Sequence, residues 1–333
     1  MMATPIHRTP CTVAMLCVLA AAAASTACAG GDSAGRSFMS LGTAGTGGLY
    51  YPIGGALASR LSVRDAERTY TAEVTGGSVE NIQRLQNREM DLAFVIGTTM
   101  WEAYHGGTDF EQPQTWIRII APLYPNLTHV LVRQGQSIAS VADLRGRRVS
   151  VGPGGSGTEQ LARQVLEAYG LSYDDVEERF LSFTESASAL GDGAIDAAII
   201  TVGYPASAVL EATTTGRVQL LPIDAAHTQT LADRYPYYSP SEIPAGSYPG
   251  QDAAVPTFAV MNWVIARDDL PAAVATNVLE ILAGELDQLR QAVEIAGQIR
   301  LTNLYAAPIP LHDAVRAWLD ARGDELNITR QNQ

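Results

Sequence analysis

The chain has 333 residues and is acidic: 35 Asp and Glu oppose 22 basic residues, which gives a net charge of −13 at pH 7. It contains no lysine, so a lysine Schiff base and the lysine of a phosphate-binding P-loop are excluded. The acidic balance argues against nucleic acid as a partner, because the phosphate backbone attracts clustered cations. The cysteines all lie within the first 28 residues, which leaves no pair for a disulfide or a metal site in the rest of the chain.

The N-terminus has the pattern of a secretory signal. His7 and Arg8 precede an apolar stretch over residues 12–24, which is too short to span a bilayer, and small residues follow. We therefore expect a signal peptide over residues 1–27 and an exported protein that is periplasmic or otherwise extracytoplasmic.

A possible anchoring site follows the signal. Ala27 and Cys28 resemble a bacterial lipobox, although Ser25 stands where leucine is usual. We expect a lipid anchor at Cys28, with residues 28–36 as a tether and with no other attachment to the membrane. Ordinary cleavage near the same place is the alternative.

From residue 38 onward, short apolar runs alternate with amphipathic segments, which is typical of α/β folds. Residues 235–256 are rich in Pro and Gly and are expected to form an irregular excursion, because these residues disfavour regular elements. The expected strands cover residues 38–42, 91–96, 117–123, 129–133, 148–152, 196–202 and 258–266. The expected helices cover residues 51–61, 79–85, 161–169, 271–296 and 311–322.

The length allows one or two domains, and we expect two lobes. Each lobe would hold a mainly parallel sheet flanked by helices, with a hinge where the chain crosses near residues 125–133 and 258–266. One lobe would then comprise residues 37–126 and 264–333, and the other residues 127–263.

Turns rich in Gly and hydroxyl residues follow several of the expected strands, at residues 42–56, 75–81, 152–159 and 203–205. Helix-start N–H groups lack intrahelical partners, and the helix dipole favours negative charge there, so such turns bind anions. Convergence of these turns is typical of a cleft between lobes. A tight turn without a ligand is the alternative for each of them.

Two of these turns also carry capping signals. Ser78 is placed as an N-cap. Ser156 and Glu159 fit a capping box, in which a serine caps the helix and a glutamate three residues later reaches back to it.

The turn at residues 152–159 matches two catalytic or cofactor patterns weakly. Gly152, Gly154 and Gly157 have the spacing of a dinucleotide fingerprint. Asp174 and Asp175 lie near the offset expected for a ribose-binding acid, but they fall in a polar stretch and not at the end of a strand. Gly154, Ser156 and Thr158 nearly match the nucleophile elbow of serine hydrolases, with threonine where glycine is required.

A hydrolase would also need a base. His105 lies in a loop-like stretch and His129 in an apolar run, and neither has an acid at a telling spacing. No zinc or EF-hand motif is present, so we expect no metal, no cofactor and no catalytic residue.

Six motifs in order resemble the TAXI group of solute receptors, which serve TRAP transporters. The segment GTGGLYYPIGG at residues 45–55 resembles their opening signature, and TGGSVEN at 75–81 is similar to their second. The resemblance continues through LYP at 123–125, DLRG at 143–146, VGPGGSGT at 151–158 and GAIDAA at 193–198.

This resemblance implies a two-lobed periplasmic-binding-protein fold that closes on a small carboxylate, with glutamate and 2-oxoglutarate-like dicarboxylates as candidates. It implies no catalysis, and it implies delivery of the solute to a sodium-coupled TRAP membrane permease. The strand from Leu92 usually ends near a Gln and an Asp in this group, whereas Ile96 and Thr98 stand there in this chain, which makes that wall less polar. An exported serine hydrolase and a receptor that senses without transporting are the alternatives.

We expect the carboxylate to be held through hydroxyls and helix-start N–H groups, and the body of the ligand to lie against Tyr50 and Tyr204. The expected ligand-binding residues are Gly45, Thr46, Gly47, Tyr50, Ser78, Thr98, Ser156, Gly157, Thr158 and Tyr204.

Overall fold

The computed structural model describes residues 1, 37–107 and 109–322. The predicted signal peptide, the tether and the lipidation site at Cys28 therefore lie outside the described residues, Met1 apart. Residues from Phe38 onward belong to one structural unit. In the part of the chain that is described, no helix combines the length and the apolar character needed to cross a membrane.

The expected alternation of strands and helices is present. The strands are β1 (Ser37–Gly42), β2 (Arg68–Glu73), β3 (Leu92–Ile96), β4 (Ile117–Arg133), β5 (Arg148–Ser150), β6 (Glu177–Arg179), β7 (Ala197–Val202), β8 (Val218–Leu221), β9 (Tyr238–Ile243) and β10 (Val255–Arg267). The α-helices are α1 (Tyr50–Arg64), α2 (Ser78–Gln86), α3 (Gly97–His105), α4 (Gly157–Ala168), α5 (Phe183–Asp192), α6 (Ser207–Thr214), α7 (Ala225–Arg234), α8 (Ala272–Gly284), α9 (Leu286–Ala292) and α10 (Asp313–Arg322). Short 3-10 helices lie at Val141–Leu144, Tyr173–Asp175, Glu294–Gln298 and Leu301–Ala306.

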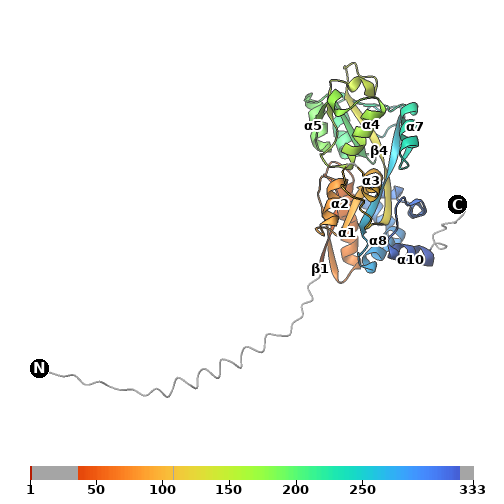
Figure 1. The fold of residues 1–333 in the computed structure, drawn as a ribbon. Coiled ribbons are helices and arrows are strands. Elements are labelled where there is room, and N and C mark those ends of the chain that lie inside the picture. The colour runs from red at the N-terminus through yellow and green to blue at the C-terminus, as the bar shows by residue number, and fades with distance from the viewer. Residues whose placement is uncertain (2–36, 108, 323–333) are drawn as a thin grey trace. The chain divides into compact units, whose positions relative to one another are not determined.

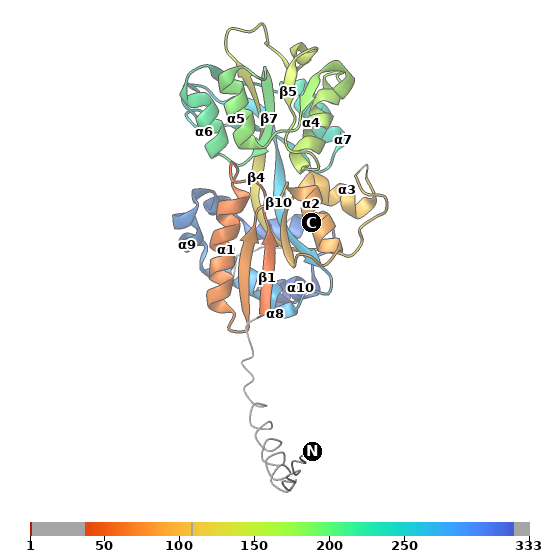
Figure 2. The same ribbon diagram turned by 90° about the vertical axis from the view of Figure 1, so that its left-hand side faces the viewer.

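The strands form a sheet in the order β2-β1-β3-β10-β4-β7-β5-β6, with β8 paired to β4 and β9 paired to β10. Within each half of this order the short strands are parallel: β1 pairs with β3, and β5 pairs with β6 and β7. β4 and β10 run antiparallel to each other and to these neighbours. Both long strands pass between two lobes, with α1, α2 and α8 in one lobe and α4, α5 and α7 in the other (Figures 1 and 2).

Apolar side chains gather into separate cores. One lies around β1, β3, α1 and α8, and we call the part of the chain around it lobe I. The other two form lobe II and lie on opposite faces of its sheet, because alternate residues of β7 enter each: Ile199 belongs to one and Ile200 to the other. The exact lobe boundaries at 37–126, 127–263 and 264–333 stay a prediction.

The expected break between residues 123 and 129 is wrong. β4 continues through Pro125, a residue that cannot donate to a strand ladder. The pairing of β4 with β10 shifts register between Met261 and Trp263, opposite this segment, and the irregularity accommodates the proline.

Two other expectations also need correction. The Pro-rich segment at 235–256 contains β9, which pairs with β10, and Pro240 is tolerated there because the described pairing of β9 involves one side only. The helix expected over residues 271–296 is interrupted: α8 ends at Gly284 and α9 begins at Leu286. The helix expected at 311–322 is confirmed as α10.

Candidate functional site

A cavity of about 60 Å³ lies between the lobes, where several strands end and several helices begin. This volume exceeds the ~10–15 Å³ that a single water molecule requires, so the space can admit a small solute. The lining residues are Ala44, Gly45, Gly47, Gly48, Leu49, Tyr50, Gly76, Gly77, Ser78, Ile96, Tyr124, Asn126, Pro153, Ser156, Gly157, Thr158, Phe183, Thr201 and Val202.

The turn between β1 and α1 reaches across to lobe II. The Gly47 carbonyl accepts hydrogen bonds from the Ser207 hydroxyl at 3.2 Å and from the Ala208 N–H at 3.3 Å. Both donors belong to α6. This contact joins the lobes on one side of the cavity.

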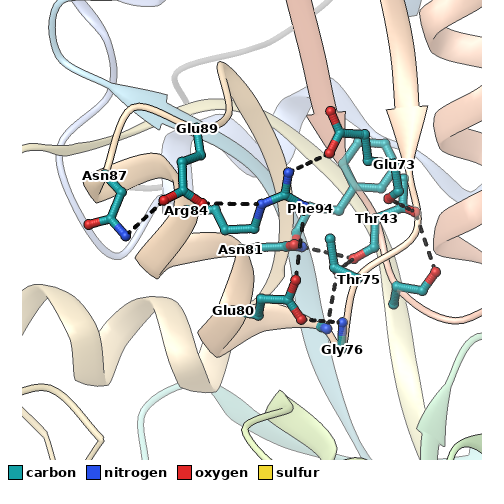
Figure 3. A network of polar contacts seen from close by, with 12 residues as sticks. Thr43, Glu73, Thr75, Gly76, Glu80, Asn81, Arg84, Asn87, Glu89 and Phe94 are labelled. Atoms are coloured by element: carbon teal, nitrogen blue, oxygen red, sulfur yellow. Dashed lines mark hydrogen bonds and ion pairs between the residues drawn. The ribbon is translucent and has the colours of Figure 1, made fainter.

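The turn before α2 is fixed by a polar network (Figure 3). Asn81 donates from Nδ2 to the carbonyls of Thr43 and Phe94, both at 2.8 Å. The Gly76 N–H donates to Glu80 at 2.7 Å, and Arg84 pairs with Glu73 at 2.5 Å. The network holds the start of α2 in place at the edge of the cavity.

Ser78 is not the N-cap that the sequence predicts. Gly77 occupies that position with a φ of 123°, which only glycine adopts readily, and Ser78 is the first helical residue. The Ser78 hydroxyl instead accepts from the N–H of Ile96 at 3.0 Å. It therefore ties the start of α2 to the end of β3.

The N-terminus of α4 faces the cavity from lobe II. Ser156 is its N-cap, as predicted, and its hydroxyl oxygen accepts from the N–H of Glu159 at 3.1 Å. The rest of the predicted capping box is absent here, because the Glu159 carboxylate pairs with Arg163 at 2.7 Å and with the Tyr173 hydroxyl at 2.8 Å. Among the described residues the first N–H groups of α4, at Gly157 and Thr158, have no hydrogen-bond partner.

Gly157 is a point of close approach between the lobes. A Cβ added there would lie 2.3 Å from Cγ2 of Ile96 and 2.8 Å from Oγ1 of Thr99. Thr99 lies at the start of α3, and Ile96 ends β3 while its side chain packs into a core of lobe II. The absence of a side chain is therefore what lets α4 reach lobe I.

Tyr50 is the first residue of α1, and its hydroxyl is hydrogen-bonded within the protein. That hydroxyl donates to Oδ1 of Asn262 at 2.5 Å, and Nδ2 of Asn262 donates to the Tyr124 carbonyl at 2.7 Å. Burial raises the pKa of Tyr50 well above its ordinary value, while a hydrogen bond with Ser78 lowers it. Tyr50 is thus neutral, and it contributes to the lining of the cavity.

The electrostatics of the site come from dipoles. No Asp, Glu or Arg side chain is among the described residues that line the cavity. The starts of α1, α2, α4 and α5 contribute to the lining, and such ends carry partial positive charge. The arrangement is chemically suited to a small anion.

Residues 41–320 match the NMT1-like family. The chain belongs to the NMT1-like family.

Other comparisons report similarities to individual proteins. A putative aliphatic sulfonates-binding protein of Escherichia coli (strain K12) is 30% identical over 92 residues, and the match spans 28% of each chain. A solved structure from Bordetella bronchiseptica RB50 has a TM-score of 0.56 at 14% identity and covers 86% of this chain and 98% of its own. PhnD1 of Prochlorococcus marinus (MIT 9301), solved with methylphosphonate, has a TM-score of 0.54 at 13% identity and covers 88% and 99%. The two structures share the two-lobed binding-protein fold predicted from the sequence.

Most of the residues predicted from sequence lie together in this NMT1-like protein. Those that line the cavity are Gly45, Gly47, Tyr50, Ser78, Ser156, Gly157 and Thr158. Thr46 is exposed and lies outside the lining.

Two further predicted residues lie elsewhere. The Thr98 hydroxyl donates to Tyr238 at 3.3 Å, because α3 begins directly after β3 and turns Thr98 away from the cavity. Tyr204 packs against an apolar core of lobe II.

Several lining residues were not predicted, including Phe183, Thr201 and Val202. Tyr124 and Asn126 had a usable signal, because two polar groups two residues apart in an apolar run share one face of a strand.

The histidines do not complete a hydrolase site at Ser156. His105 is the last residue of α3, not part of a loop as predicted. His129 contacts the Leu127 carbonyl and the Tyr248 hydroxyl, and His227 pairs with Asp224. Among the residues that the structure covers, no histidine bonds to Ser156, and no group of three or more His, Cys, Asp and Glu could hold a metal ion.

Proposed function

We propose that the protein is an extracytoplasmic solute receptor that captures a small carboxylate in the cavity between its lobes. It would deliver this solute to a sodium-coupled TRAP membrane permease. The observation that carries the proposal is the convergence of helix N-termini on a cavity whose described lining has no charged side chain.

This arrangement favours an anion of low charge. Ser156 has a free hydroxyl proton because its oxygen caps α4, and the Gly157 and Thr158 N–H groups are available beside it. Charge-assisted hydrogen bonds of this kind contribute ~1.5–3 kcal/mol each. The acidic net charge of −13 gives no long-range attraction, so local dipoles have to supply the binding energy.

The transport role rests on two supports. The six ordered motifs resemble TAXI receptors, and the two-lobed fold of this NMT1-like chain is consistent with a binding protein. Contacts between lobes at Gly47 and Gly157 support a receptor that closes on its solute, since closure changes the surface that a permease reads. Anchoring through Cys28 would hold such a receptor at the membrane.

The test is a titration of the purified protein, followed by calorimetry, with small carboxylates, methylphosphonate and an alkanesulfonate. Saturable binding of a carboxylate at one site per chain, tighter than either other anion, supports the proposal. Tighter binding of the phosphonate or the sulfonate would assign the solute to that class of anion and not to the carboxylates. Hydrolysis of an ester by the protein would favour the enzyme alternative. Uptake of the solute that depends on a TRAP permease distinguishes transport from sensing.

A further inference from the structure

A cluster of polar side chains joins α3 to α4 outside the cavity. Residues three or four apart are neighbours on a helix, so Thr99 and Glu102 share a face of α3, and Gln160 and Gln164 share a face of α4. The Thr99 hydroxyl donates to Oε1 of Gln160 at 2.6 Å. The Glu102 carboxylate accepts from Nε2 of Gln160 at 3.2 Å and from Nε2 of Gln164 at 2.8 Å. None of the four residues belongs to the described lining of the cavity.

The two helices belong to different lobes, as the packing of their other faces shows. Met100 and Ala103 of α3 enter the core of lobe I, whereas Leu161 and Val165 of α4 enter a core of lobe II. α3 lies at the edge of lobe I that faces α4 (Figure 2). The hydrogen bonds between the polar faces therefore require the two helices to lie side by side, and separation of the lobes at this place would break them.

Tyr237 adds a further donor from lobe II. It packs against a core of that lobe, and its hydroxyl donates to Oε1 of Glu102 at 3.3 Å. The cluster is shielded from water, because Gln160 is 2% exposed and Gln164 is 9% exposed. Hydrogen bonds to an ionised acceptor are stronger than bonds between neutral groups, and they strengthen further where water is excluded. Glu102 is therefore the acceptor on which the donors of lobe II converge.

Two effects oppose these bonds. Burial raises the pKa of Glu102, and the charge of Asp109 acts in the same direction, so covering the carboxylate costs free energy. The hydrogen bonds with Tyr237 and Gln164 and the charge of Arg163 act the other way. Glu102 keeps part of its surface in water, so the cost of its burial is partial, whereas its donors in the cluster all come from lobe II. We expect the hydrogen bonds to outweigh the burial.

We infer that Glu102, Gln160 and Gln164 form a latch that favours the closed arrangement of the lobes and sets the solute affinity from outside the cavity. This inference rests on the proposed function, in which the lobes close on a solute between them. A contact made only in the closed form shifts the equilibrium toward that form, so a receptor that is open without solute gains affinity by the same factor. The latch residues act through the lobes and not by touching the solute.

Two variants and their combination test the latch. Calorimetry measures the affinity of each for the tightest-binding anion among small carboxylates, methylphosphonate and an alkanesulfonate. Glu102→Ala removes the shared acceptor, and Gln160→Ala removes an amide that also donates to Asp109, so each should weaken binding by about 5- to 50-fold. Because the two residues share a hydrogen bond, the loss in the double variant should be at least about threefold smaller than the product of the two single losses.

Glu285→Ala is the matched control. Glu285 is half-buried like Glu102, and it accepts from Nε of Arg60 at 2.6 Å. Arg60 lies on α1 and Glu285 at the start of α9, and both helices pack on the core of lobe I. This variant should lower the free energy of unfolding and leave the affinity within about twofold of the wild type, because its ion pair lies within one lobe.

The outcomes separate the latch from the proposed function. Wild-type or tighter binding in Glu102→Ala overturns the latch and leaves the receptor standing. Losses that multiply fully in the double variant, or an equal loss in Glu285→Ala, also overturn the latch alone. A coupled loss of affinity for methylphosphonate or the alkanesulfonate supports the latch while it overturns carboxylate as the solute class. Binding of none of these anions overturns the proposed function and the latch together.

Discussion

Gly157→Ala should block contact between the lobes without unfolding either of them. The new Cβ would lie 2.3 Å from Cγ2 of Ile96 and 3.1 Å from the Ser78 hydroxyl. Carbon atoms in contact prefer a separation of about 3.5–4.0 Å, so lobe II would have to withdraw by about 1 Å. Overpacking of this kind costs ~1–3 kcal/mol, and every ~1.4 kcal/mol is tenfold in affinity, so binding should weaken by about 5- to 150-fold.

The stability of the unliganded protein should fall by no more than the ~1–3 kcal/mol of overpacking, because Ile96, which the new Cβ would strike, also packs into a core of lobe II. Calorimetry measures the affinity, and thermal unfolding without ligand measures the stability. Small-angle scattering with saturating ligand should show a smaller decrease in the radius of gyration than for the wild type. Gly154→Ala is the matched control, since its Cβ would have no neighbour closer than 3.9 Å.

Wild-type affinity and full compaction in Gly157→Ala would refute the reasoning. So would equal weakening in Gly154→Ala, which would assign the effect to the flexibility of the turn.

The remaining predictions concern affinity and stability. Ser156→Ala should weaken carboxylate binding more than tenfold, by ~1.5–3 kcal/mol, and should lower the free energy of unfolding by ~1 kcal/mol because a helix cap is lost. Ser140→Ala, which loses a cap away from the cavity, should lower stability alone. An affinity of Ser156→Ala equal to that of the wild type would contradict the assignment. Tyr50→Phe should destabilise the protein by ~1–3 kcal/mol in urea unfolding by leaving Oδ1 of Asn262 unpaired, whereas Tyr204→Phe should leave affinity within about twofold. Burial lowers the pKa of His129 to about 4. The contribution of this buried neutral ring to the free energy of unfolding is therefore fully present above pH 6.5 and is lost as the pH falls toward 4. Up to ~3 kcal/mol of unfolding free energy should disappear over that window, and an unchanged slope in His129→Gln would count against this cause.

The glycine turns could be located from sequence because local chemistry decides them. A strand followed by Gly-rich residues and a helix start predicts unpaired N–H groups at one edge of a sheet, and Gly45, Gly47, Ser156 and Gly157 do meet at the cavity. The N-cap role of Ser156 followed from the same local rules.

The polar wall of the cavity could not be located in the same way. Pro125 predicts an interruption of the strand. Only the irregular pairing with β10 lets β4 continue through this residue and bring Asn126 to the cavity. Thr98 lies outside the lining and bonds to Tyr238 on β9, where local composition predicts irregular structure. Both outcomes depend on pairing between distant segments, which local propensity does not contain.

The most direct test of the receptor is a crystal structure of the purified protein with the tightest-binding carboxylate from the titration. We expect one carboxylate in the cavity between the lobes, with its oxygens within hydrogen-bond distance of the Ser156 hydroxyl and the N–H groups of Gly157 and Thr158. A carboxylate bound outside this cavity, or one held there by an arginine instead of the start of α4, would contradict the account.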